Sequence, residues 1–353
     1  MGSGIVSVAA LVENLRLQAI GCRHLGSPFY AELVELMADD VEAGGPVWTL
    51  LGAHAGESFG AAYPIRLLGG VHRMVLSGAA PALAAHFPTT GGDGDVVGMW
   101  PEYRDLLASQ PAVVLDTLQR PPQTNEVGRA ASLAGGLAVV AQCTDLPIRL
   151  LEIGTSAGLN LRLDRYCFEQ DGIGWGDPAS TVRFSQLWAP ACPPFDARTV
   201  IASRRGCDRD PIDVTADDAT LALLSYVWPG QDARFRTLHD ALEIAKTVPV
   251  SIDRADAVEW LPHQLTERRA GQATVVMHSI FWQYLAAEAQ DAIVATFADA
   301  GARGTADAPL AWLRLEPSER GTETELRLTR WPGGDEVVLA TAGFHAGPVE
   351  WRA

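Results

Sequence analysis

The stretch Arg149-Leu-Leu-Glu-Ile-Gly-Thr-Ser-Ala-Gly-Leu-Asn160 decides the fold of this chain. The apolar run 148–153 predicts a buried strand, the glycine-rich residues 154–158 predict a tight turn, and a helix-compatible segment follows. Glycine lets the backbone reverse within a few residues and lets a ligand approach it closely. The stretch therefore predicts a strand, a turn and a helix, with a ligand site at the turn.

A first interpretation of this turn comes from a resemblance. The pattern Glu152-x-Gly154-x-x-x-Gly158 resembles motif I of the class I S-adenosylmethionine-dependent methyltransferases. In that family the turn holds the methionine part of the cofactor. Ser156 stands where the fuller form of the motif has another glycine.

The same residues allow two other interpretations. They satisfy G-x-S-x-G, the nucleophile elbow of α/β-hydrolases, with Ser156 as the nucleophile. Chain order permits a triad with Asp256 and then His278 or His345. The remaining interpretation is an ordinary tight turn between a strand and a helix.

Composition limits the possible partners. The chain has 353 residues, of which 48% are hydrophobic and 20% charged, enough for one large core or two medium ones. Its formal net charge is −16, and Lys and Arg cluster only in pairs. Binding to nucleic acid depends on neutralising many phosphates, so we do not expect a nucleic-acid partner.

Cysteine usage and hydropathy bear on location. The five cysteines are widely spread and form no C-x-x-C pair, so neither a disulfide framework nor a zinc site is predicted. Residues 1–10 lack the basic start of a signal peptide, and no apolar run is long enough for a membrane span. We expect a cytoplasmic protein without a metal or membrane partner, and the sequence does not predict its oligomeric state.

Residues 1–145 are predicted to form an all-helical N-terminal cap. Ser27-Pro28, for example, provides an N-cap and a first-turn proline. Residues 146–353 are predicted to form a Rossmann-like, methyltransferase-type domain with an insertion at about 167–197. In a hydrolase several strands precede the nucleophile, so a motif carried by the first strand favours the methyltransferase interpretation.

Acidic residues follow the next two predicted strands. Residues 198–213 predict a second strand that ends at Asp208, a candidate ligand for ribose hydroxyls, with Asp210 and Asp213 as alternatives. Residues 248–252 predict a third strand, and Asp256-Ala257 after it resembles the methyltransferase loop that meets adenine. An N-cap role for Asp256 is compatible with this function.

The run 273–278 predicts a buried strand that delivers His278 to the carboxyl edge of the sheet. His278 is a candidate general base, because imidazole titrates near neutrality, although a structural histidine is the alternative. Ser279, Trp282 and Tyr284 follow it where methyltransferases contact their substrates.

Three polar residues, Asn125, Glu126 and Arg129, precede the first strand on the first turns of a predicted helix. They either cap that helix or line the rim of the ligand site.

The end of the chain completes the predicted fold. Residues 310–315 predict a strand, and 325–331 and 336–342 alternate around a Pro-Gly-Gly-Asp turn typical of a hairpin. The predicted fold class is α/β, a doubly wound, mostly parallel sheet of about seven strands that ends in an antiparallel hairpin.

Five blocks of the chain resemble a bacterial domain-of-unknown-function family: 123–129, 152–161, 205–208, 225–229 and 278–284. This resemblance implies a shared fold and brings no activity with it. The motifs predict an S-adenosylmethionine-dependent methyltransferase with a small-molecule acceptor. The alternatives are a serine hydrolase that uses Ser156 and a binding module without catalysis.

The predicted cofactor-binding residues are Glu152, Gly154, Thr155, Ser156, Gly158, Asn160, Asp208, Asp256 and Ala257. The predicted catalytic residues are His278, Tyr284 and Glu126, and the predicted substrate-binding residues are Asn125, Arg129, Ser279 and Trp282.

Overall fold

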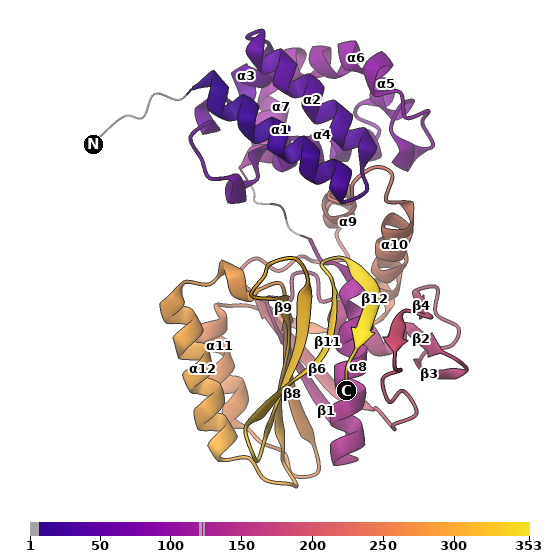
Figure 1. Ribbon diagram of the computed structural model, residues 1–353, viewed down its shortest axis with the longest axis vertical. Helices are drawn as coiled ribbons and strands as arrows, with labels where there is room; N and C mark the ends of the chain where they lie inside the picture. Colours follow the sequence, from indigo (N-terminus) through magenta and orange to yellow (C-terminus); the bar gives the residue numbers. More distant parts are fainter. Residues whose placement is uncertain (1–6, 120–121, 123) are drawn as a thin grey trace. The chain divides into compact units, whose positions relative to one another are not determined.

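The computed structural model describes residues 7–119, 122 and 124–353. It divides into two compact units (Figure 1), residues 1–124 with 216–236 and residues 125–215 with 237–353. Residues 1–6 of the N-terminal segment and Gln123 of the first family block lie outside the described residues.

The first unit is helical, as predicted, and no strand occurs between residues 7 and 144 where the structure describes them. Ser27 is the N-cap of the second helix, and its side chain accepts a hydrogen bond from the Tyr30 amide. The α-helices are α1 (Val8–His24), α2 (Pro28–Glu42), α3 (Pro46–Leu51), α4 (Tyr63–Leu76), α5 (Pro81–Ala84), α6 (Val96–Ser109), α7 (Pro111–Leu118) and α9 (Asp217–Ser225).

The segment 216–236 belongs to this helical unit although it follows three strands of the nine-stranded sheet in sequence. The indole of Trp228 packs against Tyr30, with ring centroids 6.3 Å apart, and Ser27 Oγ donates to the Pro229 carbonyl (2.7 Å). The ring of Tyr226 lies where a Cβ on Gly69 would be. Contacts between residues so far apart in the sequence leave no periodic pattern. The sequence therefore did not predict that 216–236 belongs with the helical unit.

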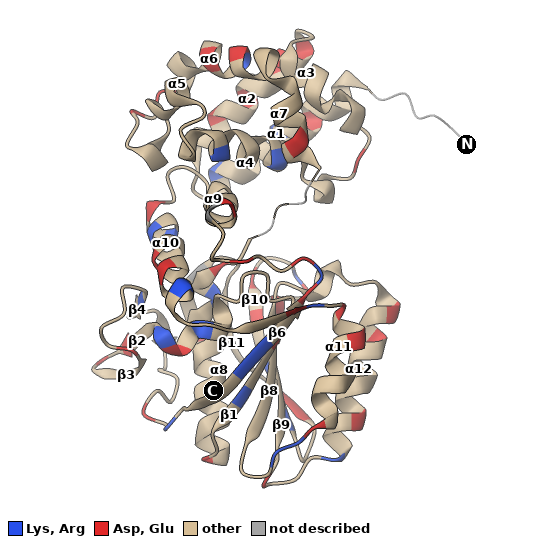
Figure 2. Cartoon of the chain, turned by 180° about the vertical axis from the view of Figure 1, so that it is seen from behind, with Lys and Arg blue, Asp and Glu red and all other residues tan. Residues whose placement is uncertain are grey.

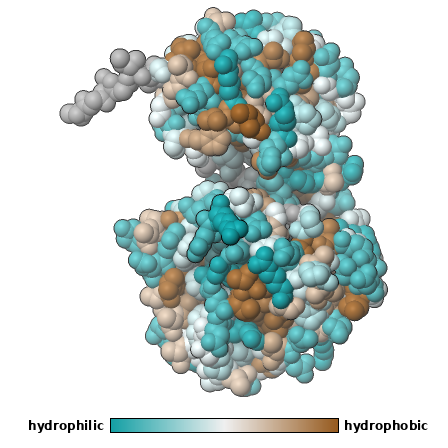
Figure 3. All heavy atoms as spheres, in the orientation of Figure 1, coloured by the Kyte–Doolittle hydropathy of each residue, from teal (hydrophilic) through white to brown (hydrophobic). Residues whose placement is uncertain are grey.

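The helical surface is not uniformly polar. α1 buries Leu11, Leu15 and Ala19 but leaves Leu17 and Ile20 more than half exposed. Figure 3 shows apolar patches among polar side chains on the helical unit. Figure 2 shows acidic and basic residues interspersed along both units, and none of the described helices has the length and apolar character needed to cross a membrane.

The second unit is built on a nine-stranded sheet in the order β5-β12-β11-β10-β9-β8-β1-β6-β7. The strands from β9 to β7 in this order are parallel, and β9 to β12 are antiparallel. Their bounds are β1 (Ile148–Ile153), β5 (Trp188–Pro190), β6 (Ile201–Asp208), β7 (Ser251–Arg254), β8 (Ala273–Ser279), β9 (Leu310–Pro317), β10 (Thr324–Trp331), β11 (Asp335–Gly343) and β12 (Ala346–Trp351).

Helices cover both faces of this sheet. α11 (Ala257–Thr266) and α12 (Ala287–Ala302) lie on one side and α8 (Ala130–Thr144) on the other (Figure 1). α8 packs closely because Gly135 and Gly136 face Trp351 and Leu313, which lie where their Cβ atoms would be. α8 therefore belongs to the sheet unit, whereas the sequence grouped it with the cap. α10 (Asp232–Thr247) crosses the boundary between the units.

The sheet has nine strands instead of the predicted seven or so, and β5 and β12 are the two that the sequence did not predict. Residues 346–351 pair antiparallel with β11, and β5 pairs with β12. The predicted turn between β10 and β11 is confirmed, and Gly333 and Gly334 there have positive φ. The α/β class, with a mostly parallel sheet that ends in antiparallel strands, is confirmed, with a longer antiparallel part than expected.

The segment after the glycine turn differs from the prediction. It forms a six-residue 3₁₀-helix, η5 (Asn160–Arg165), instead of an α-helix. The chain then enters a small sheet of β3 (Ile173–Gly176), β2 (Cys167–Gln170) and β4 (Arg183–Ser185), which fills much of the predicted insertion. A helix of this length has only a few aligned amides to face a ligand at its start.

A buried histidine makes the helical unit sensitive to acid. His72 is 0% exposed, its Nδ1–H donates to the Ser225 carbonyl (3.0 Å), and its Nε2 lies 2.8 Å from the Thr89 hydroxyl. Burial lowers its pKa to about 4. In the unfolded chain its pKa is near 6.5, so protons bind preferentially to the unfolded state and stability is lost as the pH falls between these values.

We expect this imidazole to cost about 2 kcal/mol of stability between about pH 7.5 and about pH 5. In His72→Gln the amide retains a donor and an acceptor but does not titrate, so the loss should shrink by that amount. Urea unfolding of both proteins at the two pH values measures the difference. An equal acid sensitivity of the two proteins would contradict this assignment.

Candidate functional site

The candidate site lies at the carboxyl edge of the five parallel strands. In their chain order these strands lie third, second, first, fourth and fifth across the sheet, so the connections reverse direction between β1 and β8. In open α/β sheets ligands bind outside the carboxyl ends of the strands at such a point. The glycine turn Gly154–Gly158 directly follows β1 at this edge.

The turn has three residues with left-handed backbone: Gly154 (φ 69°), Ser156 (φ 51°) and Gly158 (φ 69°). The amides of Gly154 and Thr155 both donate to the Cys207 carbonyl, at 3.0 and 3.1 Å, which ties the turn to β6. A non-glycine residue with positive φ is uncommon and needs support from its surroundings. Ser156 is therefore the strained residue of the turn.

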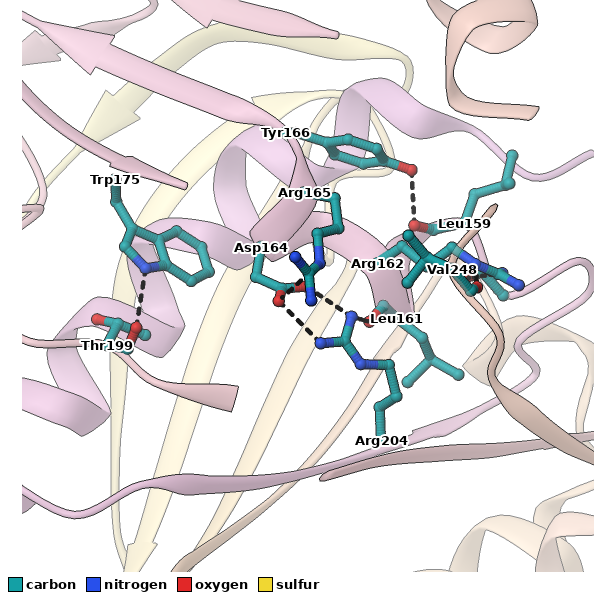
Figure 4. Close-up of polar contacts among 11 residues, drawn as sticks. Leu159, Leu161, Arg162, Asp164, Arg165, Tyr166, Trp175, Thr199, Arg204 and Val248 are labelled. Carbon is teal, nitrogen blue, oxygen red and sulfur yellow. Dashed lines mark hydrogen bonds and ion pairs between the residues drawn. The ribbon is translucent and has the colours of Figure 1, made fainter. Parts of the chain in front are cut away.

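Side chains from the same unit hold the turn from behind. Arg162 donates to the carbonyls of Ala157 (3.1 Å) and Gly158 (2.9 Å), and its Nε donates to the Val248 carbonyl (2.7 Å). Figure 4 shows the contact of Arg162 with Val248, and also the Tyr166 hydroxyl that donates to the Leu159 carbonyl (2.7 Å). The guanidinium of Arg162 is buried and uses backbone carbonyls in place of a carboxylate, so its role is to fix the turn.

Asn125 anchors the other side of the turn, where its Oδ1 accepts from the Leu159 amide (3.0 Å). Arg129 donates to the carbonyls of Ser279 and Phe344, both at 3.2 Å. Glu126 accepts from the Gly128 amide (3.0 Å), and His345 Nδ1 lies 3.3 Å from Glu126 Oε2. The polar residues predicted at the rim thus cap the chain before α8 and also reach the loops after β1, β8 and β11.

The glycine at position 154 is needed for packing. A Cβ there would lie 2.2 Å from Cδ2 of Phe281, so the aromatic ring uses the space that we expected a ligand to approach. A Cβ on Gly158 would lie 2.9 Å from Cδ1 of Ile252. Both glycines are explained by positive φ and by neighbouring side chains, independently of a ligand.

Asp208 joins three strand ends. Its Oδ2 accepts from the Ser156 amide (2.8 Å), and its Oδ1 accepts from the Asp210 amide (2.9 Å). Its carbonyl accepts from the Ala255 amide (2.9 Å) after β7. The loops after β1, β6 and β7 therefore converge on one residue, which the sequence placed at the end of β6 in spite of the insertion.

Asp256 is the N-cap of α11, and its Oδ1 accepts from the Val258 amide (2.9 Å). Its Oδ2 pairs with Arg209 (2.6 Å), whose side chain is 68% exposed. Burial by itself would raise the pKa of Asp256, but the Val258 amide and Arg209 lower it below its usual value. The N-cap role is present, and Ala257 is the buried first residue of the helix.

Glu152 lies in the sheet at the end of β1 and is 2% exposed. Burial raises the pKa of Glu152 to about 8, although a hydrogen bond from the Thr155 hydroxyl (2.5 Å) opposes this shift. At neutral pH this side chain is therefore largely an uncharged acid.

Two buried polar atoms at the turn lack partners among the described residues: Ser156 Oγ and Asn160 Oδ1. Their residues are 8% and 1% exposed. Buried polar groups without partners are rare and costly, and each one suggests an interaction with another molecule. The Ser156–imidazole hydrogen bond that the hydrolase interpretation requires is not present in the described part of the chain.

His278 does not have the free nitrogen that a general base needs. The Trp312 indole, which can only donate, bonds to Nε2 (3.0 Å), so Nδ1 carries the proton and donates to Glu316 Oε1 (2.6 Å). His278 is 0% exposed, and Trp282 stacks on it with ring centroids 5.6 Å apart. In this conformation His278 is a structural residue, which corrects its predicted role as a base. Tyr284 is 73% exposed.

The sequence reasoning missed Glu316, Phe281 and Arg162. Glu316 could have been recognised from the sequence, because it is an acidic residue at the end of a parallel strand, like Asp208. Phe281 and Arg162 had none beyond their closeness to the motifs. Within residues 7–119, 122 and 124–353, no three His, Cys, Asp or Glu side chains group closely enough to hold a metal ion.

The raised pKa of Glu152 predicts sensitivity to alkali. Its folded pKa of about 8 lies above the ordinary value of 4.5, so the folded state holds the proton more tightly and loses stability as the pH rises from 4.5 through 8. Glu152→Gln keeps an oxygen for Thr155 and does not ionise. We expect the melting temperature of this variant to fall less than that of the wild type between about pH 6 and about pH 9. Melting temperatures that change equally with pH in the two proteins would show that Glu152 is charged in the folded protein.

Comparison with known proteins identifies a family for residues 12–351. Searches of the curated proteins and of the solved structures returned no match. A family model described as "Uncharacterized protein conserved in bacteria (DUF2332)" matches residues 12–351. The chain therefore belongs to the bacterial family DUF2332.

Proposed function

We propose that the sheet unit is a Rossmann-like, S-adenosylmethionine-dependent methyltransferase that acts on a small-molecule acceptor. The observation that carries this proposal is the convergence on Asp208. One carboxylate binds the amide of Ser156 in the glycine turn, and the carbonyl of the same residue binds the loop after β7. Open α/β sheets bind nucleotides at loops of this kind, outside the carboxyl ends of their strands.

Strand order supports the Rossmann-like assignment. The third, second, first, fourth and fifth core strands are neighbours in this order, as in dinucleotide-binding sheets. The position between β1 and β8 is where such sheets bind their ligands. The antiparallel strands β10 to β12 lie on the far side of β9 from this position.

The residues at the edge fit the groups of this cofactor. Each oxygen of Asp208 accepts one backbone N–H and keeps capacity for a further donor, such as a ribose hydroxyl. Ser156 Oγ and Asn160 Oδ1 have unused hydrogen-bonding capacity at the turn. Asp256 is available once its exposed ion pair with Arg209 opens, and such pairs are weak.

When bound, the cofactor supplies an electrophilic methyl group, so the protein has mainly to position the two reactants. The turn is preorganised for this purpose by Arg162, Asn125 and Tyr166. Both ring nitrogens of His278 are hydrogen-bonded. We therefore propose that the pair of Glu126 and His345 accepts the proton that the methyl acceptor loses. The net charge of −16 favours a small acceptor over a nucleic acid.

Calorimetric titration with S-adenosylmethionine and S-adenosylhomocysteine tests the proposal. We expect both to bind, and we expect Asp208→Asn to weaken binding by at least about tenfold, because an amide nitrogen would face backbone donors or the ribose. Asp213→Asn is the matched control, since among the described residues this exposed aspartate bonds only to Thr215 in its own turn. No heat with either ligand, or equal affinities for the two variants, would reject the assignment.

One observation favours a serine hydrolase as the second candidate. Ser156 has the strained, left-handed backbone of a nucleophile elbow. A fluorophosphonate probe distinguishes the two candidates, because an activated serine forms a covalent adduct. Labelling of the wild type but not of Ser156→Ala, together with no cofactor binding, would favour the hydrolase. Cofactor binding without turnover on any acceptor would favour a binding module.

A further inference from the structure

The loop that follows β8 is held in a strained conformation. Ile280 has φ 48°, a left-handed value that a β-branched residue rarely adopts. Such residues persist only where the surrounding structure holds them, and they concentrate at functional sites. The contacts of this loop therefore indicate what holds the strain.

The Ile280 amide itself donates to the Leu315 carbonyl (2.9 Å), and one carboxylate binds the amides of the two residues that follow. Oε1 and Oε2 of Glu316 accept from the Phe281 amide at 3.0 and 3.2 Å, and Oε2 accepts from the Trp282 amide at 3.3 Å. Oε1 also accepts from His278 Nδ1 at 2.6 Å. The Glu316 side chain is 14% exposed, so these bonds are largely shielded from water.

Only a carboxylate suits this position. The Trp312 indole fixes His278 as the tautomer with its proton on Nδ1, so Glu316 faces three N–H donors, one from the imidazole and two from the backbone. An ionised carboxylate has acceptors alone and bonds N–H groups strongly. A glutamine here would place an NH₂ group against at least one of these donors.

The loop in turn forms a wall of the glycine turn, since the Phe281 ring lies against Gly154 where a Cβ would be. We propose that Glu316 is a positioning residue that holds the loop Ser279–Trp282 in its strained form and so sets the distance between Phe281 and the glycine turn. The identity of the ligand at that turn rests on the proposed function. The action of Glu316 on the loop does not.

The test compares Glu316→Gln with Glu325→Gln. Glu325 lies directly opposite Glu316 in the β9–β10 pair, but its carboxylate bonds to Arg327 on its own strand. In the ligand-free protein we expect Glu316→Gln to speed hydrogen exchange of the Phe281 and Trp282 amides by at least about tenfold, because one of the two oxygens that accept from them and from His278 becomes an NH₂ group. Exchange in β10 should stay unchanged, and Glu325→Gln should leave the loop as in the wild type.

A second substitution tests the strain. Asparagine enters the left-handed region more readily than isoleucine, so Ile280→Asn should slow exchange of the two amides when combined with Glu316→Gln. A simple packing defect at Glu316 would not be rescued in this way. If Glu316→Gln does not fold, Ile280→Asn alone should slow exchange of the same amides relative to the wild type.

Titration with S-adenosylhomocysteine links the loop to the site. If Glu316→Gln shows faster loop exchange and weaker binding than the wild type, the positioning role is supported. Unchanged loop exchange, no rescue by Ile280→Asn, or unchanged affinity would overturn it. If the wild type binds no S-adenosylhomocysteine while loop exchange responds as expected, the proposed function fails and the hold of Glu316 on the loop stands.

Discussion

The hydrogen bond from the Ser156 amide to the carboxylate of Asp208 is the interaction on which the rest of the candidate site depends. It joins β1 to β6 beyond the end of their ladder, and it stabilises a non-glycine residue with φ 51°. A bond from N–H to an ionised carboxylate is stronger than one between neutral groups, so it can offset the strain at Ser156. Because the Asp208 carbonyl also binds Ala255, the same residue brings the third strand end to the edge.

Around this bond, the polar groups behind the turn are satisfied within the protein. Arg162, Asn125 and Tyr166 bind the backbone of residues 157–159, which leaves that backbone little freedom. Ser156 Oγ and Asn160 Oδ1, which lack partners among the described residues, therefore lie beside a firmly held backbone. Groups held in this way lose little entropy when they bind, which is the property that a preorganised site requires.

The parallel strands and the residues at their ends could be predicted, because strands buried on both faces form continuous apolar runs and the carboxyl ends of parallel strands meet at one edge. The position of Asp208 followed from this rule despite the long insertion before β6. The use of each side chain could not be predicted in the same way. His278 and Glu316 are 38 residues apart in sequence, and neither residue type indicates that the imidazole is fully bonded. Gly154 was expected to admit a ligand, but it accommodates Phe281.

The sequence by itself determined the α/β class, the core strands in their order along the chain, and the glycine and acidic residues at the strand ends. These features follow from local periodicity and turn chemistry, which act over a few residues. Only the tertiary structure decided that α8 belongs to the sheet unit and 216–236 to the helical unit, that β5 and β12 extend the sheet, and which polar atoms are satisfied internally. The physical reason is that hydrophobic periodicity indicates a buried face but does not identify the residues that pack against it. Packing and hydrogen bonding depend on neighbours that folding brings from distant parts of the chain.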